Sequence, residues 1–268
     1  KDNNLTLEKA AKEAVESDDN VLVQAGPGAG KTELLAQKAM YIFENNLLKN
    51  NKKILAISFK KDSADNLKKR VVLRCGKENG EKFISLTFDA FCKMLIDQFR
   101  NGVPVEYRPS KDYMVMMKDA SNEIAEIYED FYNHQYNLTF TEKNLLLSKV
   151  ESIRISSMTP SDEVYPIWNK LINQSPSKLT FKMINSLAIF LLEKNPYILK
   201  TVQHTFEYIF LDEFQDTTTQ QYELIKMLFK GADSKLIAVG DSNQRIMVWA
   251  GADKEIFDKF KNDFSAKE

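Results

Sequence analysis

The chain has 268 residues, of which 43% are hydrophobic and 28% charged, and its formal net charge is −1. This composition is typical of a globular protein and excludes a disordered or fibrous chain. Because the charge is nearly balanced, any nucleic-acid binding would have to come from a local surface rather than from a global basic field.

Cysteine usage and hydropathy indicate the compartment. Cys75 and Cys92 are the two cysteines, and neither belongs to a CxxC or Cys/His cluster, so we interpret both as structural thiols of a reducing compartment. No apolar run reaches the roughly 18–20 residues of a membrane span. The first residues, KDNNLTLEKA, lack the apolar core of a signal peptide and an initiating methionine, which indicates a trimmed sequence. We therefore expect a cytoplasmic protein with no membrane partner.

In the first third of the chain, predicted strands alternate with predicted helices. Short apolar runs predict strands, and apolar residues near a 3.6-residue spacing predict helices. The predicted strands cover residues 20–25, 53–59 and 83–88, and the predicted helices cover 31–44, 62–74 and 89–99. Alternation of this kind predicts a parallel sheet with helices on both faces.

The middle of the chain differs. Residues 104–177 show helical patterns at 113–132 and 142–155, no convincing strand, and prolines that break them up. The alternation then returns with a helix at 181–194, a strand at 206–211, a helix at 219–229 and a strand at 235–239. We therefore predict an α/β fold interrupted by an all-helical insertion.

A glycine-rich turn, AGPGAGKT, runs from Ala25 to Thr32 between a predicted strand and a predicted helix. A phosphate-binding P-loop requires this context, because small residues let backbone N–H groups close around phosphate oxygens and the helix N-terminus adds positive potential. Lys31 would reach the β- and γ-phosphates, and the Thr32 hydroxyl would hold Mg²⁺. The alternative is an ordinary glycine-rich turn. Strand, loop, GKT and helix together favour the nucleotide.

A cluster of acids, DEFQD, directly follows the apolar segment at 206–211. Buried charge is costly unless it is paired, metal-bound or used. With a P-loop in the same chain, Asp212 is placed to support Mg²⁺, and Glu213 is placed to polarise the attacking water as a general base. A solvated strand end is the alternative, and it would hold in a chain without a P-loop. Gln215 and Asp216 could organise this site or cap the following helix.

A third element, VGDSNQRIMVWAGA, covers residues 239–252. Here another apolar strand ends in a glycine and an aspartate, and a polar loop follows. Gln244 could sense a γ-phosphate by hydrogen bonding. Trp249, flanked by small residues, could be a stacking platform for a base, with core packing as an equal alternative.

Together these elements resemble motifs I, II and III of the superfamily 1 DNA helicases of the UvrD/Rep/PcrA type, in the same order and with similar spacing. ILAISFKKDSADNLKKRV at 54–71 resembles motif Ia, and LTFDAF at 86–91 resembles motif Ib. The resemblance implies that residues 1–103 and 178–268 form a RecA-like P-loop NTPase domain, the family's domain 1A. The helical residues 104–177 match its inserted domain 1B in position and length.

The resemblance implies a motor that hydrolyses ATP with Mg²⁺ and moves, usually 3′ to 5′, on single-stranded DNA, with DNA junctions as further partners. Carried over by position, the catalytic residues are Lys31, Asp212, Glu213 and Gln244, and the metal ligands are Thr32 and Asp212. The ATP-binding residues are Gln24, Ala25, Gly26, Gly28, Ala29, Gly30, Lys31, Thr32 and Glu33. The DNA-binding residues are Ser58, Phe59, Lys60, Thr87, Phe88 and Trp249. The lysines after Phe59 fit phosphate contacts, with a solvated helix face as an equal alternative.

The chain departs from the family's pattern in several places. No glutamine lies near Ala11, the position at which members of the family carry a glutamine that recognises adenine. Glu33 replaces the frequent arginine after the P-loop threonine, and Asp89 replaces the histidine of motif Ib. In motif III, Met247 and Ala250 stand where the family has an aromatic residue and an arginine.

The last residues, IFDKFKNDFSAKE, resemble the stretch before the family's motif IV. Motifs IV to VI and domain 2A, which carries an arginine finger, do not follow in this sequence. Loss of an arginine finger costs ~10³–10⁵ in rate in related chemistry. We therefore expect the 1A–1B half of a longer enzyme, which binds nucleotide weakly and hydrolyses it poorly.

Two functions remain open. The leading one is a DNA helicase or translocase fragment, and the alternative is a helicase-like ATPase switch that senses DNA ends or nucleotide levels without unwinding, as in some anti-phage defence systems. The departures at Glu33, Asp89 and Ala250 favour the switch slightly. A small-molecule P-loop kinase fits badly, because it would not require the Asp-Glu pair or the glutamine and tryptophan of the third element.

Overall fold

The computed structural model describes residues 9–26, 28–49, 51–117, 119–133, 137–241, 253 and 255–268. The chain divides into two compact units. The first combines Lys1–Phe88 with Lys200–Glu268, and the second is Asp89–Leu199. The fold is α/β, with a central parallel sheet flanked by helices in the first unit.

The sheet of the first unit has the strand order β1-β7-β6-β2-β3, and all neighbouring strands in its described part are parallel. The strands are β1 (Val21–Gln24), β2 (Lys53–Ser58), β3 (Phe83–Thr87), β6 (Phe206–Leu211) and β7 (Lys235–Gly240). In register, the last residue of β1 pairs with the last of β7, and the last of β2 with the last of β3. The carboxyl ends of the strands therefore meet at one edge, which is where ligands bind in open α/β sheets.

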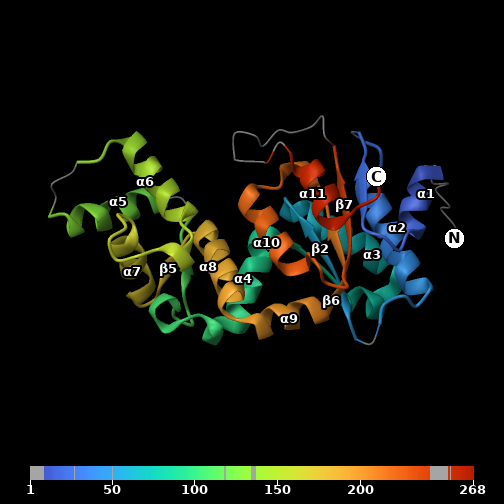
Figure 1. Cartoon of the computed structure of the whole chain (residues 1–268), viewed down its shortest axis with the longest axis horizontal. Helices are drawn as coiled ribbons and strands as arrows, with labels where there is room; N and C mark the ends of the chain where they lie inside the picture. The colour runs from blue at the N-terminus through green and yellow to red at the C-terminus, as the bar shows by residue number, and fades with distance from the viewer. Residues whose placement is uncertain are drawn as a thin grey trace. The chain divides into compact units, whose positions relative to one another are not determined.

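Helices cover both faces of this sheet (Figure 1). On one face lie α1 (Lys9–Glu16), α2 (Lys31–Glu44) and α3 (Lys61–Glu81), whose apolar sides form one core with the strands. On the other lie α10 (Thr219–Phe229) and α11 (Ile256–Phe264), together with the short 3₁₀ helix η4 (Phe214–Asp216). The ring of Phe214 packs edge-on against rings of α10 and α11. Since β6 is buried along its whole length, the residues that follow it emerge between two covered faces.

The second unit is mainly helical. Its helices are α4 (Phe88–Phe99, from Asp89 onward), α5 (Ala120–Phe131), α6 (Phe140–Ser152), α7 (Tyr165–Asn173), α8 (Phe181–Lys194) and the first part of α9 (Pro196–Thr205). Short 3₁₀ helices η1 (Arg100–Gly102), η2 (Val105–Tyr107) and η3 (Ile155–Ser157) connect them. Trp168 is fully buried in this unit, and its indole N–H donates to the carbonyl oxygen of Val150 at 3.0 Å.

The prediction that the middle of the chain contains no strand is wrong. Strand β4 (Met114–Val115) pairs in parallel with β5 (Lys178–Leu179) in the second unit. Two-residue strands leave no periodic signal in a sequence, so the pattern at 113–132 predicts one continuous helix. The predicted domain boundaries at 103/104 and 177/178 differ from the boundaries of the compact units, and the assignment to domains 1A and 1B stays a prediction. Within the described residues, no helix is long and apolar enough to cross a membrane.

Candidate functional site

The glycine-rich loop leaves β1 at the carboxyl edge of the sheet. Gly28 and Gly30 have φ of 72° and 77°, in the left-handed region that glycine adopts without a steric penalty. The backbone N–H of Ala25 donates to the carbonyl oxygen of Gly240 at 2.9 Å, which ties the start of the loop to the end of β7. Gly26 and Ala29 are exposed. The loop therefore ends at the N-terminus of α2 with exposed small residues, as a phosphate cradle requires.

Lys31 and Thr32 are the first two residues of α2. The side chain of Lys31 is 9% exposed, and its Nζ lies 3.4 Å from the carbonyl oxygen of Ala25 and 4.0 Å from Oε2 of Glu213. The Lys31 ammonium is thus shared between the loop and the acidic cluster after β6. Thr32 is half-buried beside it.

Asp212 directly follows β6 and is 5% exposed. Its backbone N–H donates to the carbonyl oxygen of Ile57 at 2.9 Å, which extends the β2–β6 pairing by one residue. Oδ1 accepts the backbone N–H of Glu213 at 3.1 Å, whereas the buried Oδ2 makes no hydrogen bond of good geometry among the described residues, although the nearby Ser58 hydroxyl is close enough to lower the pKa of the carboxyl. Burial raises the pKa of Asp212 to about 6, the charge of Glu213 adds to the increase, and Lys31 opposes it.

The buried Oδ2 of Asp212 provides a test of whether Mg²⁺ fits the site. Burying a carboxylate oxygen without a partner is costly, and a bound cation removes the cost. Carboxylate and hydroxyl oxygens are the hard donors that Mg²⁺ accepts. In the described part of the chain, no group of three or more His, Cys, Asp or Glu side chains could hold a metal ion. The Asp212 carboxylate therefore fits a magnesium ion that takes most of its ligands from substrate phosphates and water, and Thr32 stays the predicted second protein ligand.

Glu213 has an unusual backbone. Its φ of 50° and ψ of 45° lie in the left-handed region, where a non-glycine residue costs about 1–3 kcal/mol. Its carboxylate is 35% exposed and accepts a hydrogen bond from Nε2 of Gln215 at 2.8 Å. Gln215 is a residue whose role the sequence left open, because nothing in DEFQD shows which neighbours its amide reaches.

Glu33, in the first turn of α2, faces α3. Its carboxylate forms ion pairs with Arg70 at 3.0 Å and Arg74 at 2.5 Å, and it accepts a hydrogen bond from Gln37 at 3.0 Å. Partial burial pushes the pKa of Glu33 upward, but hydrogen bonds from Arg74 and Gln37 outweigh this and hold the pKa below its usual value. Glu33 is thus fixed to α3 rather than left exposed beside the loop.

A groove of about 630 Å³ adjoins the glycine loop. Three alanines of α1 line it, together with β1, the loop, and the last two residues of the sequence: Ala10, Ala11, Ala14, Val23, Gln24, Ala25, Ala29, Leu34, Lys267 and Glu268 are among its lining residues. The side chain of Gln24 donates to Glu268 at 2.6 Å. The groove wall formed by α1 therefore combines the methyl groups of three alanines with the acidic side chain of Glu13.

The DNA-binding candidates lie where β2 and β3 end. Phe59 and Lys60 follow β2, and Lys60 is exposed at the start of α3. Ser58 pairs in register with the half-buried Thr87 of β3 and is 1% exposed, with no hydrogen-bond partner for its hydroxyl among the described residues. Phe88 is 7% exposed. Of these residues, the structure exposes Lys60 and part of Phe59 and Thr87, and it buries Ser58 and Phe88.

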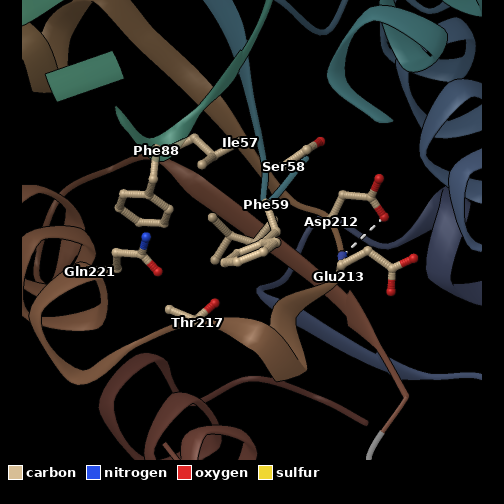
Figure 2. Close-up of a pocket in the computed structure, with 9 residues that line it drawn as sticks. Ile57, Ser58, Phe59, Phe88, Asp212, Glu213, Thr217 and Gln221 are labelled. Carbon is tan, nitrogen blue, oxygen red and sulfur yellow. Dashed lines mark hydrogen bonds between the residues drawn. The ribbon is translucent and has the colours of Figure 1, made fainter. Parts of the chain in front are cut away.

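These aromatic residues and the acids share a small cavity of about 10 Å³, room for roughly one water molecule. Figure 2 shows Phe88 and Gln221 at one end of it and Asp212 and Glu213 at the other, with Phe59 between them. The candidate DNA residues and the candidate catalytic acids therefore lie around one cavity at the carboxyl edge of the sheet. The predicted roles of Gln244 and Trp249 fall on residues outside the described part of the chain.

Comparison with known proteins places the chain in a family. The family model for the UvrD/REP helicase N-terminal domain matches residues 7–265. A probable DNA helicase II homolog and a probable DNA helicase, both of Mycoplasma pneumoniae, are 28% and 30% identical over 97% of this chain. The ATP-dependent DNA helicase PcrA of Staphylococcus aureus is 26% identical over 94%. The chain spans 38%, 51% and 35% of the lengths of these three proteins. The chain therefore belongs to the UvrD/REP helicase N-terminal domain family.

Proposed function

We propose that this chain is the ATP-binding part of a DNA helicase or translocase that hydrolyses ATP with Mg²⁺. The observation that carries the proposal is the meeting of a P-loop lysine and two acids at one edge of the sheet. Lys31 Nζ lies 4.0 Å from Glu213, next to Asp212 with its unpartnered buried oxygen. Family membership and the helicase names of the relatives support it.

Each residue has a distinct role in this proposal. The backbone N–H groups of the loop and of the start of α2 bind the phosphates, and Lys31 neutralises charge at the β- and γ-phosphates. Asp212 and Thr32 hold Mg²⁺, which supplies charge neutralisation at the phosphate oxygens. Glu213 orients the attacking water and accepts its proton. With this left-handed backbone, the Glu213 carboxylate lies 4.0 Å from Lys31 Nζ.

The groove beside the loop is the place we propose for the nucleoside. A triphosphate seated on the loop would extend its base along α1, where Ala10, Ala11 and Ala14 offer apolar contact. Among the described residues, those that α1 contributes to the groove carry no side-chain amide, and the amide of Gln24 on β1 is bonded to Glu268. We therefore propose apolar contact rather than hydrogen bonding as the main base contact there.

Single-stranded DNA would run past the ends of β2 and β3. Lys60 would contact a phosphate, the half-buried Phe59 would contact a base, and Thr87 would line the track together with Trp249. Movement from 3′ to 5′ and binding at DNA junctions are part of the proposal through the family. The first unit corresponds to domain 1A and the helical unit to domain 1B.

The activity of a whole helicase is a further proposal, since the chain spans between about a third and a half of the relatives it matches. In the family, a second RecA-like domain supplies an arginine finger to the nucleotide. We propose that this chain alone binds nucleotide weakly and turns it over slowly. We also propose a cytoplasmic location, in keeping with two unpaired cysteines in a chain of this length.

A second candidate is a helicase-like ATPase that senses DNA or nucleotide without unwinding. The contacts of Glu33 favour it, because the position that often carries an arginine in the family carries an acid fixed by Arg70 and Arg74. ATP hydrolysis by the full-length protein without strand separation on a fluorescent duplex would support the sensor. Strand separation would support the motor.

The first test is a calorimetric titration of a non-hydrolysable ATP analogue with Mg²⁺, comparing the chain with Lys31→Ala and Lys60→Ala. We expect saturable binding that Lys31→Ala abolishes and Lys60→Ala leaves unchanged. A parallel titration with a fluorescent single-stranded oligonucleotide should show weaker binding for Lys60→Ala alone. Equal nucleotide binding by the chain and Lys31→Ala would refute the P-loop assignment.

A further inference from the structure

The side chain of Gln215 bridges the ends of two strands. It lies in η4, just after β6, and is 2% exposed. Its Nε2 donates to Oε2 of Glu213 at 2.8 Å, and its Oε1 accepts the backbone N–H of Asp241, directly after β7, at 3.0 Å. Both ends of the amide are thus engaged, one with the proposed general base and one with the neighbouring strand.

Glu213 needs such a support. Its left-handed backbone is a conformation that persists in folded proteins where surrounding groups hold it. Its backbone N–H is fixed by Asp212 Oδ1, and its carboxylate, 35% exposed, is oriented by Gln215 and faces Lys31 at 4.0 Å. Without the amide, this carboxylate would have more rotameric freedom at the edge of the site.

The Gln215 amide packs against Gly240, where the absence of a side chain leaves room for it. A β-carbon at Gly240 would lie 2.7 Å from Oε1 of Gln215, 3.0 Å from Cζ of Phe257 and 3.1 Å from the backbone nitrogen of Gln215. Gly240 is not among the glycines with positive φ, so the requirement here is space rather than backbone conformation. The carbonyl oxygen of Gly240 also accepts the N–H of Ala25 in the glycine loop at 2.9 Å. The end of β7 therefore contacts both the nucleotide loop and the support of Glu213.

We infer that Gln215 is a positioning residue that fixes the Glu213 carboxylate relative to the C-terminal end of β7. The rate of the hydrolytic step then depends on the position of that end of the strand. This inference rests on the proposed role of Glu213 as general base. The Gln215 amide contacts Glu213, which orients and deprotonates the attacking water, and not the residues that bind the phosphates. Its loss should therefore impair the transition state and leave ground-state nucleotide binding nearly intact.

The test compares two ligands with the same protein. One is a non-hydrolysable ATP analogue with Mg²⁺, and the other is ADP with aluminium fluoride and Mg²⁺, which mimics the phosphoryl group in transfer with its attacking water. The measurement uses the full-length protein, in which the second RecA-like domain would supply the arginine finger, and this parent should prefer the aluminium fluoride complex. Gln215→Met, which keeps the length and removes both hydrogen bonds, should bind the ATP analogue within about threefold of the parent and lose on the order of 10-fold to 10²-fold for the mimic.

A second variant perturbs the same contact from the other strand. Gly240→Ala retains Gln215 but places a methyl group 2.7 Å from its oxygen and 3.0 Å from the Phe257 ring, and, with its fold checked by circular dichroism and thermal melting, it should reproduce the loss for the mimic. In a Glu213→Gln background, Gln215→Met should cause little further loss, because the two residues act as one unit. A purely structural role would give an additional loss in that background.

Asn20→Leu is the matched control. The Asn20 amide also bridges two backbone segments, donating to Phe264 O and accepting from Leu236 N, both at 2.8 Å, near the opposite end of β7. The Asn20→Leu substitution should lower the melting temperature of the protein and leave its preference for the aluminium fluoride complex unchanged. The inference is overturned if the parent shows no preference, or if Gln215→Met and Gly240→Ala both keep it. If the parent binds neither ligand, the proposed function itself fails and the inference falls with it.

Discussion

The Lys31 ammonium lies 4.0 Å from the Glu213 carboxylate, across the gap between α2 and the end of β6. Glu213→Gln removes this charge and the proton acceptor. We expect nucleotide binding to be retained or tightened, because Lys31 no longer has a competing anion. Single-turnover hydrolysis of radiolabelled ATP should fall by roughly 10²–10⁴-fold.

Glu207→Gln is the control for that measurement. Glu207 lies in β6, near the end opposite Asp212 and Glu213, where it accepts the backbone N–H of Lys49 at 2.6 Å. A glutamine oxygen can keep that bond, and the hydrolysis rate should stay at the parental value. An unchanged rate in Glu213→Gln would remove Glu213 from the proposed mechanism.

Gly30→Ala separates backbone strain from nucleotide binding. A β-carbon there has room, with its nearest neighbour at 3.7 Å, but the φ of 77° disfavours any L side chain. We expect a loss of about 1–2 kcal/mol in the free energy of unfolding in urea and weaker nucleotide binding. Gly231→Ala has the same φ of 77° and no neighbour within 4 Å, after α10. It should lose similar stability with unchanged binding. Equal nucleotide affinity in both variants would contradict the phosphate-cradle role of the loop.

Much of the α/β architecture could be predicted because its elements are long and regular. The predicted helix at Lys31–Glu44 and the strand at Phe206–Leu211 have the bounds that the structure shows. The second predicted helix ended at residue 74, whereas α3 continues to Glu81 through a break at Gly76, whose φ of 81° is not helical. A glycine in a polar stretch favours a stop, and the sequence gives no sign that helical turns resume beyond it.

The site was less predictable because it depends on tertiary register. DEFQD and the P-loop indicate that acids and phosphates belong together, which identifies Lys31, Asp212 and Glu213 as candidates. Nothing local shows that the Gln215 amide reaches Asp241, because that contact arises from the pairing of β6 with β7. The burial of Ser58 likewise follows from its position at the end of a strand with neighbours on both sides.

Phe59 and Phe88 should behave differently. Phe59 is half-buried beside the exposed Lys60, whereas Phe88 is 7% exposed. Phe59→Ala should weaken binding of a single-stranded oligonucleotide by about 1–3 kcal/mol, measured by fluorescence anisotropy, as loss of a base stack does. Phe88→Ala should cost about 3–5 kcal/mol of unfolding free energy. If Phe59→Ala leaves oligonucleotide affinity unchanged, the DNA track does not pass this residue.

Lys38 of α2 is buried, with 1% of the residue exposed, and its Nζ donates to the carbonyl oxygen of Ser17 at 2.5 Å. Burial lowers the pKa of Lys38 to about 8, and the charge of Asp18 opposes this. In the unfolded chain the pKa is about 10.4. Between these values the unfolded state binds more protons than the folded state, so Lys38 makes the free energy of unfolding rise with pH.

Lys38→Met removes this titration while keeping an unbranched apolar side chain. The stability difference, variant minus parent, should be most favourable to the variant at pH 7 and should shrink steadily toward pH 10, as the parent loses its buried charge. Urea unfolding at several pH values measures it, and tyrosine or cysteine titration affects both proteins alike. Lys12→Met, at a lysine of α1 whose side chain is 66% exposed, should show no such trend. A difference independent of pH for Lys38→Met would mean that Lys38 keeps an ordinary pKa in the folded protein.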